Sequence, residues 1–439
     1  MRSYKRRGRT NTVLLILCLF LIAVIVVGTT FYIIENLPAA DEKNTENSLK
    51  DAKTVQKVEK KKQVVVHFVN NNDFSALGIT EEQNELIKSY FTKYFGSLGD
   101  FSNKLVNDLF ADYAIREANI TNMMVSYQNS IRSHSSVDMK YDEITCGVTY
   151  KSIVNDAGNI IISLVQNDYE SFAFAKDQTS YTCDVEHTFV MNLYNGSFKL
   201  VSHSEISSVY DLISGFFAND ASSEQIEASY KSLVEQTKTK MNELKNARDV
   251  YNSDPVSFMV TKTAAIPYNS KAALDYAYTW TGKTELIRNP EYESYDTRGG
   301  NCCNFVSQCL LNGGIPFDVV DAVWKWYGGE VDNTEQRTGF SESWTNSEAF
   351  YKYCTENVVG MVTDIPQNVY CGRPGDIIQY LNSDGVAKHS AIITKVIYDD
   401  DGNVLDFLVS CNTTDKVDAP MESYGYNDFR LIRIIGNSN

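Results

Sequence analysis

The chain has 439 residues and carries a formal net charge of −16 at pH 7. Nucleic acids and anionic lipid surfaces bind basic patches, so this acidic balance excludes nucleic acid as an expected partner. The length is sufficient for two ordinary domains with connectors between them.

The first predicted element is a membrane-spanning helix at residues 12–34. Five basic residues among the first ten precede this uncharged, mostly apolar run, and about 20 such residues cross a bilayer as a helix. The basic cluster is expected in the cytoplasm, which predicts a single-pass protein of the cell membrane with its C-terminal domains outside the cell. A cleaved signal peptide is the alternative, and Pro38 in the candidate cleavage site disfavours it.

Composition and periodicity divide the rest of the chain. Residues 41–62 are polar and charged, which is typical of a solvated stalk. Residues 222–250 follow the pattern of one long, mostly polar helix, which we interpret as a connector. The predicted organisation is a cytoplasmic basic tail (1–11), a membrane anchor (12–34), a polar stalk (35–63), an accessory domain (64–218), a connecting helix and linker (219–263) and a C-terminal domain (264–439).

The accessory domain combines helix and strand patterns. Residues 80–118 carry the pattern of two amphipathic helices, and the first begins with a capping box that starts at Thr80. From about residue 142 to residue 204 the apolar period shifts to two, with turn signals between the strands. This order of elements predicts a small α+β domain of the NTF2 or cystatin-like type. Cys146 and Cys183 flank a strand-rich region and are candidate disulfide partners.

A short stretch of the C-terminal domain, residues 298–314, carries the candidate nucleophile. It reads RGGNCCNFVSQCLLNGG, with apolar residues at helical spacing after the cysteine pair. Cys302 is expected at the N-terminus of a buried helix, where the macrodipole and free N–H groups favour a thiolate and lower the thiol pKa. A buried structural thiol, or a vicinal disulfide between Cys302 and Cys303, is the alternative.

A nucleophilic cysteine needs a base, and the C-terminal domain has one histidine, His389. It is expected at the start of a strand whose partner strand is residues 376–381. A third strand, residues 405–411, delivers Asn412 at its end, where the amide can orient the imidazole as in a cysteine–histidine–asparagine triad. For both side chains, an ordinary place at a strand end or in a turn is the alternative.

The ordered motifs GGNCCNFVSQCLLNGGIPF, VWKWYGG, SESWTNSEAFYKY, GDIIQY, HSAIIT and NTTD resemble the "putative amidase domain" family. That family is related to the NlpC/P60 and CHAP cell-wall cysteine hydrolases, and the resemblance covers about residues 264–439. In place of the usual Asp-Cys-Thr, this chain has Asn301, Cys302 and Cys303. Asn412 likewise begins the segment that stands for the family's His-Thr-x-Asp.

The resemblance implies a papain-like, NlpC/P60-type α+β domain, so the predicted fold class is α+β throughout, with one N-terminal transmembrane helix. The implied activity is that of a cysteine amidase or peptidase on an amide bond, by analogy one in bacterial cell-wall peptidoglycan. The competing function is a catalytically decayed cell-wall binding or scaffold protein. The partner of the accessory domain is unknown.

Three tryptophans of the C-terminal domain are candidates for lining the substrate groove, with a place in the core as the equal alternative: Trp324, Trp326 and Trp344. No metal ion or organic cofactor is expected. The cysteine spacing contains no CxxC pair suited to zinc, and His134, His187 and His203 show no ligand spacing.

Overall fold

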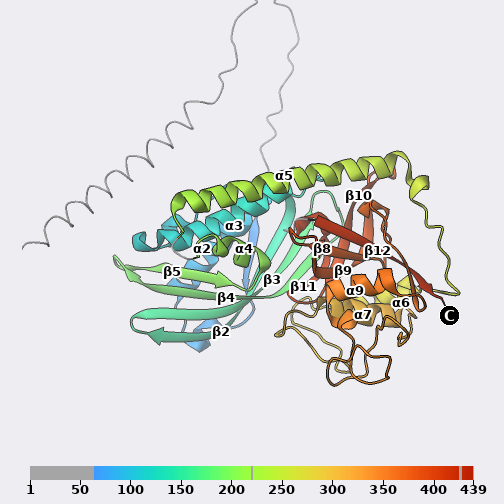
Figure 1. Cartoon of the computed structure of the whole chain (residues 1–439). Coiled ribbons are helices and arrows are strands. Elements are labelled where there is room, and N and C mark those ends of the chain that lie inside the picture. The colour runs from blue at the N-terminus through green and yellow to red at the C-terminus, as the bar shows by residue number, and fades with distance from the viewer. Residues whose placement is uncertain (1–63, 219–220, 425–427, 439) are drawn as a thin grey trace, which may run out of the picture. The chain divides into compact units, whose positions relative to one another are not determined.

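A computed structural model describes residues 64–218, 221–424 and 428–438. All of these described residues belong to one compact unit. Figure 1 shows its helices and strands with the labels used below. In the described part, six short 3₁₀ helices accompany the longer elements, at Phe74–Leu77, Asn107–Leu109, Asp112–Ala114, Pro255–Phe258, Val369–Cys371 and Met421–Ser423.

The N-terminal half packs two helices against a sheet that is antiparallel except for the parallel pairing of its first two strands. Helix α2 (Glu81–Asp100) begins at the expected capping box, in which the Thr80 hydroxyl accepts from the Gln83 N–H. Its buried face, which includes Ile87 and Phe91, packs on the sheet. The remaining elements of this half are β1 (Val66–Asn70), α3 (Ile115–His134), β2 (Tyr141–Asp156), β3 (Asn159–Phe172), β4 (Ser180–Tyr194) and β5 (Ser197–Glu205).

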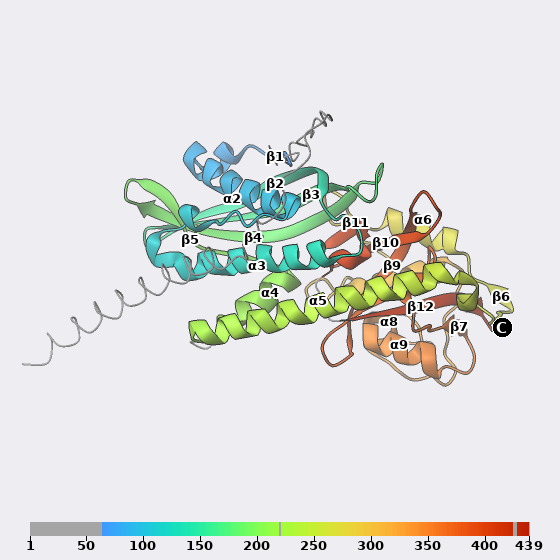
Figure 2. The same ribbon diagram turned by 90° about the horizontal axis from the view of Figure 1, so that it is seen from above.

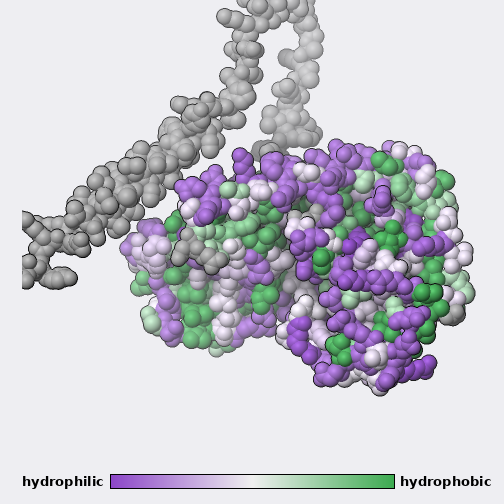
Figure 3. Space-filling model, viewed as in Figure 1, coloured by the Kyte–Doolittle hydropathy of each residue, from purple (hydrophilic) through white to green (hydrophobic). Residues whose placement is uncertain are grey.

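A long helix connects the two halves. Helix α4 (Ser208–Gly215) follows β5, and α5 (Ser223–Ser253) then packs against α3 and reaches β10 of the C-terminal half (Figure 2). Four residues of α5 are buried, at positions 226, 237, 241 and 244. The surface over this helix is accordingly mostly hydrophilic in Figure 3, which agrees with the polar helix pattern of the sequence.

The C-terminal half places helices on a strongly bent antiparallel sheet. The helices are α6 (Ser270–Thr279), α7 (Cys302–Asn312), α8 (Glu342–Thr345) and α9 (Ser347–Glu356). The strands are β6 (Ile266–Pro267), β7 (Met361–Asp364), β8 (Ile377–Leu381), β9 (Ala387–Tyr398), β10 (Val404–Cys411), β11 (Asp415–Pro420) and β12 (Asp428–Asn437).

One sheet runs through both halves, in the order β1-β2-β3-β4-β11-β10-β9-β8-β12-β6. The junction is the pairing of residues 181–183 in β4 with residues 415–417 in β11. Strand β5 pairs with residues 187–194 further along β4, so β5 and β11 share one edge of that strand. The C-terminal sheet is thereby a continuation of the N-terminal one.

Three hydrophobic cores stabilise the fold. The first lies between α2 and the N-terminal strands, and the third lies between α7 and the C-terminal sheet. The second combines residues of α3 and α5 with the opposite face of the C-terminal sheet. Because this core draws on the predicted accessory, connecting and C-terminal regions together, the domain division remains a prediction.

Two expectations need correction. The expected membrane-spanning helix at residues 12–34 lies outside the described residues, and none of the described helices is long and apolar enough to cross a membrane. A fold with a single spanning helix is therefore not supported, and the fold class that the structure supports is α+β alone. The second helix expected within 80–118 is also misplaced. Phe101, in the left-handed conformation, ends α2, and α3 begins only at Ile115.

Candidate active site

Cys302 is the first residue of α7, as the sequence predicts. Gly299 and Gly300, which precede the N-cap residue Asn301, have φ angles of +96° and +106°, which favour glycine. A β-carbon on Gly300 would also lie 3.3 Å from the Thr413 hydroxyl oxygen. The glycine pair therefore lets the chain enter α7 close against the turn between β10 and β11.

The thiol of Cys302 lies in a buried, polar environment. Its Sγ is 3.8 Å from the Ser347 Oγ, which accepts from the Ser390 hydroxyl at 2.8 Å. The backbone N–H groups of Ser390, Cys303 and Cys302 favour the thiolate, but burial has the larger effect and raises the thiol pKa. The expected lowering of this pKa by the helix terminus is therefore outweighed by desolvation.

His389 lies in β9, opposite Tyr380 of β8. Its ring is 5.7 Å from the ring of Tyr380 and 5.7 Å from that of Tyr424, with which it is stacked. Burial, and then the positive charge of Lys416, lower the imidazole pKa to about 3. The imidazole is therefore neutral at neutral pH, the form in which it can accept a proton.

Cys302 and His389 line one cavity of about 390 Å³. They reach it from different sides of β9. The thiol lies beside the backbone of Ser390, whereas the imidazole lies with Tyr380 and Tyr424, whose rings belong to the core on the α5 side. The structure thus brings the predicted nucleophile and base to a common space.

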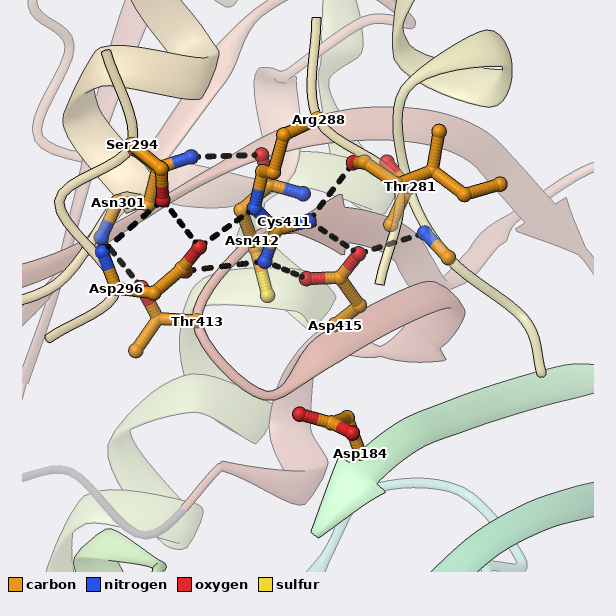
Figure 4. Close-up of polar contacts among 12 residues, drawn as sticks. Asp184, Thr281, Arg288, Ser294, Asp296, Asn301, Cys411, Asn412, Thr413 and Asp415 are labelled. Atoms are coloured by element: carbon orange, nitrogen blue, oxygen red, sulfur yellow. Dashed lines mark hydrogen bonds and ion pairs between the residues drawn. The ribbon is translucent and has the colours of Figure 1, made fainter. Parts of the chain in front are cut away.

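Asn412 is not part of that cavity wall. Its Oδ1 accepts from the Asn301 Nδ2 at 3.2 Å, and its Nδ2 donates to the Trp280 carbonyl at 3.2 Å (Figure 4). It lines a separate, small cavity together with Arg288 and Asn304. Its predicted role in orienting His389 remains a prediction. The hydrogen bonds described for its side chain instead hold the segment that leads into α7.

Asn301 stands where the family motif has aspartate, and its hydrogen bonds hold the segment that leads into α7. Its Oδ1 accepts from the Tyr295 N–H at 3.1 Å and from the Asn304 Nδ2 at 2.8 Å. Its backbone N–H donates to the Thr413 hydroxyl. The amide therefore takes over the accepting role of a carboxylate and adds the donor bond to Asn412.

The turn between β10 and β11 is strained. Thr413 and Thr414 have φ angles of 69° and 50°, in the left-handed region that β-branched residues rarely adopt. Both residues line the cavity that contains Cys302. Such outliers gather at sites where the surrounding structure enforces them, which agrees with a functional role for this turn.

A buried ion cluster holds the segment before α7. The guanidinium of Arg288 donates two bonds to Asp415, at 2.8 and 2.7 Å, and two to Asp296, at 2.8 and 3.0 Å (Figure 4). The Asp415 side chain is fully buried and also accepts from the Gly282 N–H at 2.6 Å. Sequence reasoning missed this cluster. Asp415 belongs to the motif NTTD, but no local pattern marks Arg288 as its partner.

The three candidate tryptophans lie in the core. Trp324 and Trp344 are fully buried and Trp326 is 9% exposed, and none of them lines either cavity described above. The Trp324 indole donates to Ser307, and the Trp344 indole donates to Asn304 at 2.7 Å. The structure thus supports the alternative reading, because these rings are needed to fill the space beside α7.

The eight described cysteines are all free and buried. Cys303 points away from the cavity and packs in the core beside α7, so the vicinal disulfide with Cys302 is not formed. The suggested pairing of Cys146 with Cys183 is likewise absent from the described part of the chain.

One group among the described residues has the composition of a metal site: His187, His203 and Glu205. All four ring nitrogens of the two histidines take part in hydrogen bonds, to each other, to Gln166 and to Tyr90. This is a closed polar chain, and a metal ion would have to break the bond between the two imidazoles.

Comparison with known proteins places the C-terminal half in a class. Residues 267–435 match the family described as "Putative amidase domain", so this part of the chain is similar to the domains of that family. The predicted resemblance to this family is confirmed. A particular relative is YhbB of Bacillus subtilis (strain 168), an uncharacterized protein that is 29% identical over 166 residues. The match covers 37% of this chain and 46% of that relative, so its name assigns no activity here.

Proposed function

We propose that this protein is a cysteine amidase or peptidase with Cys302 as nucleophile and His389 as general base. The observation that supports it is the shared cavity. The thiol at the start of α7 and the neutral imidazole of β9 line the same space, and three backbone N–H groups surround the thiol. The family match supplies the class of bond, an amide.

In the proposed reaction, His389 takes the proton of Cys302 as the sulfur attacks the carbonyl carbon of the amide. The raised thiol pKa and lowered imidazole pKa mean that the resting pair is uncharged, so the proton moves during the attack. The backbone N–H of Cys302 is the natural donor to the oxyanion. The amine leaves with a proton from the imidazolium, and water then releases the acyl group from the sulfur.

The proposed substrates are amide bonds of bacterial peptidoglycan, reached outside the cytoplasm. This follows the resemblance to the cell-wall cysteine hydrolases. In this proposal, Asn412 acts through Asn301, to which it is bonded, and positions the segment that leads into α7.

The experiment uses the full chain and purified peptidoglycan of several chemotypes, with products identified by mass spectrometry. Cys302→Ala and His389→Ala should abolish the release of new amines, a loss of about 10³-fold or more for the nucleophile. Cys303→Ala is the matched control, because its side chain packs in the core, and its products should persist. Absence of products from the native chain, both on every wall and on the short peptides released from those walls, would reject the proposal.

A binding protein with a decayed site is the second candidate. It is favoured by the two pKa shifts, which both keep the Cys302 and His389 pair uncharged. Binding of the native chain to peptidoglycan without any product would select this candidate.

A further inference from the structure

The cavity that contains Cys302 extends into the N-terminal half. Four carboxyl side chains line its far end. Asp211 of α4 is exposed, and the three others come from two strands: Asp168 and Glu170 of β3 and Glu205 of β5. The amidase family match begins only at residue 267, so none of these residues belongs to the matched domain. The space next to the nucleophile is thus partly built by the rest of the chain.

Asp168 is the most enclosed of the three carboxyls. Its side chain is 3% exposed, and its Oδ2 accepts from the Gln166 amide. Its buried Oδ1 has no hydrogen-bond partner among the described residues. An unpaired buried carboxyl oxygen is costly, and a donor from a bound ligand, ion or water molecule would satisfy it.

A chain of hydrogen bonds fixes the direction of the Asp168 carboxyl. Because the Gln166 amide donates to Asp168, its Oε1 must accept from the His187 Nε2, 2.8 Å away. The His187 Nδ1 then accepts from the His203 Nε2 at 2.9 Å, and the His203 Nδ1 accepts from the Tyr90 hydroxyl at 2.9 Å. Every donor and acceptor role in this buried chain follows from the first, which holds the carboxyl in one orientation.

The carboxyl groups also lack a paired cation. Among the described residues, no lysine or arginine forms an ion pair with Asp168, Glu170 or Glu205. Arg132 lines the same end, but its guanidinium donates to the Tyr141 hydroxyl and the Met139 carbonyl.

Lys416 stands towards the Cys302 end, with its Nζ 4.4 Å from the centre of the Tyr424 ring. Its charge lowers the pKa of Asp168, but burial and the charge of Glu170 are stronger and hold that pKa well above its usual range. Burial raises the pKa of Glu205 to about 7. A bound cation would lower the raised pKa values of both Asp168 and Glu205.

We propose that the Asp168, Glu170 and Glu205 end of the cavity binds an ammonium group of the substrate, namely the free amino terminus of a short peptide. This inference rests on the proposed function and names its substrate class. A volume of about 390 Å³ is near the lower limit of small-molecule sites, which suits a peptide of a few residues better than an intact wall strand. An amide carbonyl of the same peptide then lies next to Cys302.

The test measures binding, so that it does not depend on turnover. Full-length Cys302→Ala protein is titrated by calorimetry with L-alanyl-D-isoglutamine and with the same dipeptide acetylated on its amino group. The free amine should bind about 10- to 100-fold more tightly, because a charge-assisted hydrogen bond to a buried carboxylate contributes that much. Asp168→Asn, made in the same background, should remove this preference.

Glu227→Gln, which changes an exposed glutamate of α5, is the matched control and should keep the preference. Equal affinity for the two dipeptides, or no binding of either, would overturn the ammonium subsite even if Asp168→Asn proved unstable. Cleavage of wall amides without this preference would leave the proposed activity intact and reject only the subsite. A preference for the free amine without any cleavage would retain the subsite and reject the activity.

Discussion

The two ends of the cavity are supported in different ways. At the Cys302 end, charged groups far apart in the sequence, Arg288 and Asp415, hold the loop that leads into α7. At the Asp168 end, uncharged groups hold the carboxyl in place. They form the chain of hydrogen bonds from Gln166 through two histidines to Tyr90. One end has a paired ion cluster as its support, and the other has a neutral network that leaves the Asp168 carboxyl without a paired cation from the described part of the chain.

This difference shows which of the two carboxyl groups, that of Asp415 or that of Asp168, is available to bind a ligand. The carboxylate of Asp415 has three donors and is fully buried, so it contributes only to structure. The carboxyl of Asp168 accepts from the Gln166 amide, has among the described residues only the weak thiol donor of Cys146 besides, and lines the cavity. A buried acidic residue is therefore a ligand-binding candidate where its neighbours leave it unpaired.

The largest expected effect comes from breaking the ion cluster. Arg288→Ala leaves the buried Asp415 carboxylate without its main partner, which should lower the free energy of unfolding by about 3–5 kcal/mol. Arg298→Ala, in the same segment, removes an exposed ion pair with Glu293 and should change it little. Urea denaturation of both variants measures the contrast, and similar losses would show that Arg288 has no special role.

A smaller effect tests the neutral imidazole at the Cys302 end. The pKa of His389 is about 3 in the folded state and about 6.5 when unfolded, so only the unfolded chain takes up a proton between these values. The stability from this group is complete above pH 6.5 and is lost as the pH falls towards 3.

Between pH 7 and pH 5 the native protein should therefore lose about 2 kcal/mol more than His389→Gln does. Denaturant titrations at both pH values measure this difference. His134→Gln, which changes an exposed histidine of α3, should follow the native protein. Parallel losses in the native protein and His389→Gln would mean that the imidazole titrates normally in the folded state.

The smallest effect concerns a residue at neither end. Trp344→Phe removes the indole donor of the buried Asn304 and should cost about 1 kcal/mol of stability. The KM for any amide substrate should stay unchanged, since the ring lines no part of the cavity. A raised KM with native stability would restore the substrate-binding interpretation of this tryptophan.

The sequence was most informative where the pattern is local. The start of α7 at Cys302 and the position of His389 in a strand follow from glycines, helical spacing and alternation within a few residues. The same reliance on local patterns gave a wrong prediction for residues 101–114, which were expected to be helical. Val106, Leu109 and Phe110 are buried at a helix-like spacing, but they belong to a loop and 3₁₀ turns.

Contacts between distant segments could not be predicted in this way. Arg288 and Asp415 are far apart in the sequence, and the chain from Gln166 to Tyr90 joins three strands and a helix. The segment with Trp324, Trp326 and Trp344 shows a related difficulty. The presence of aromatic residues in a sequence does not tell whether they line a groove or fill a core. In each case tertiary packing decides, and one sequence does not contain that information in a local pattern.

The backbone pairing of residues 181–183 with residues 415–417 has a practical consequence. A fragment limited to the amidase-family residues would leave that stretch of β11 as an uncovered sheet edge, with N–H and C=O groups open to pairing with another chain. Self-association of such a fragment would then result from the removal of β4 and would not be a property of the whole protein. Cloning, purification and crystallisation are therefore best planned with β4 retained.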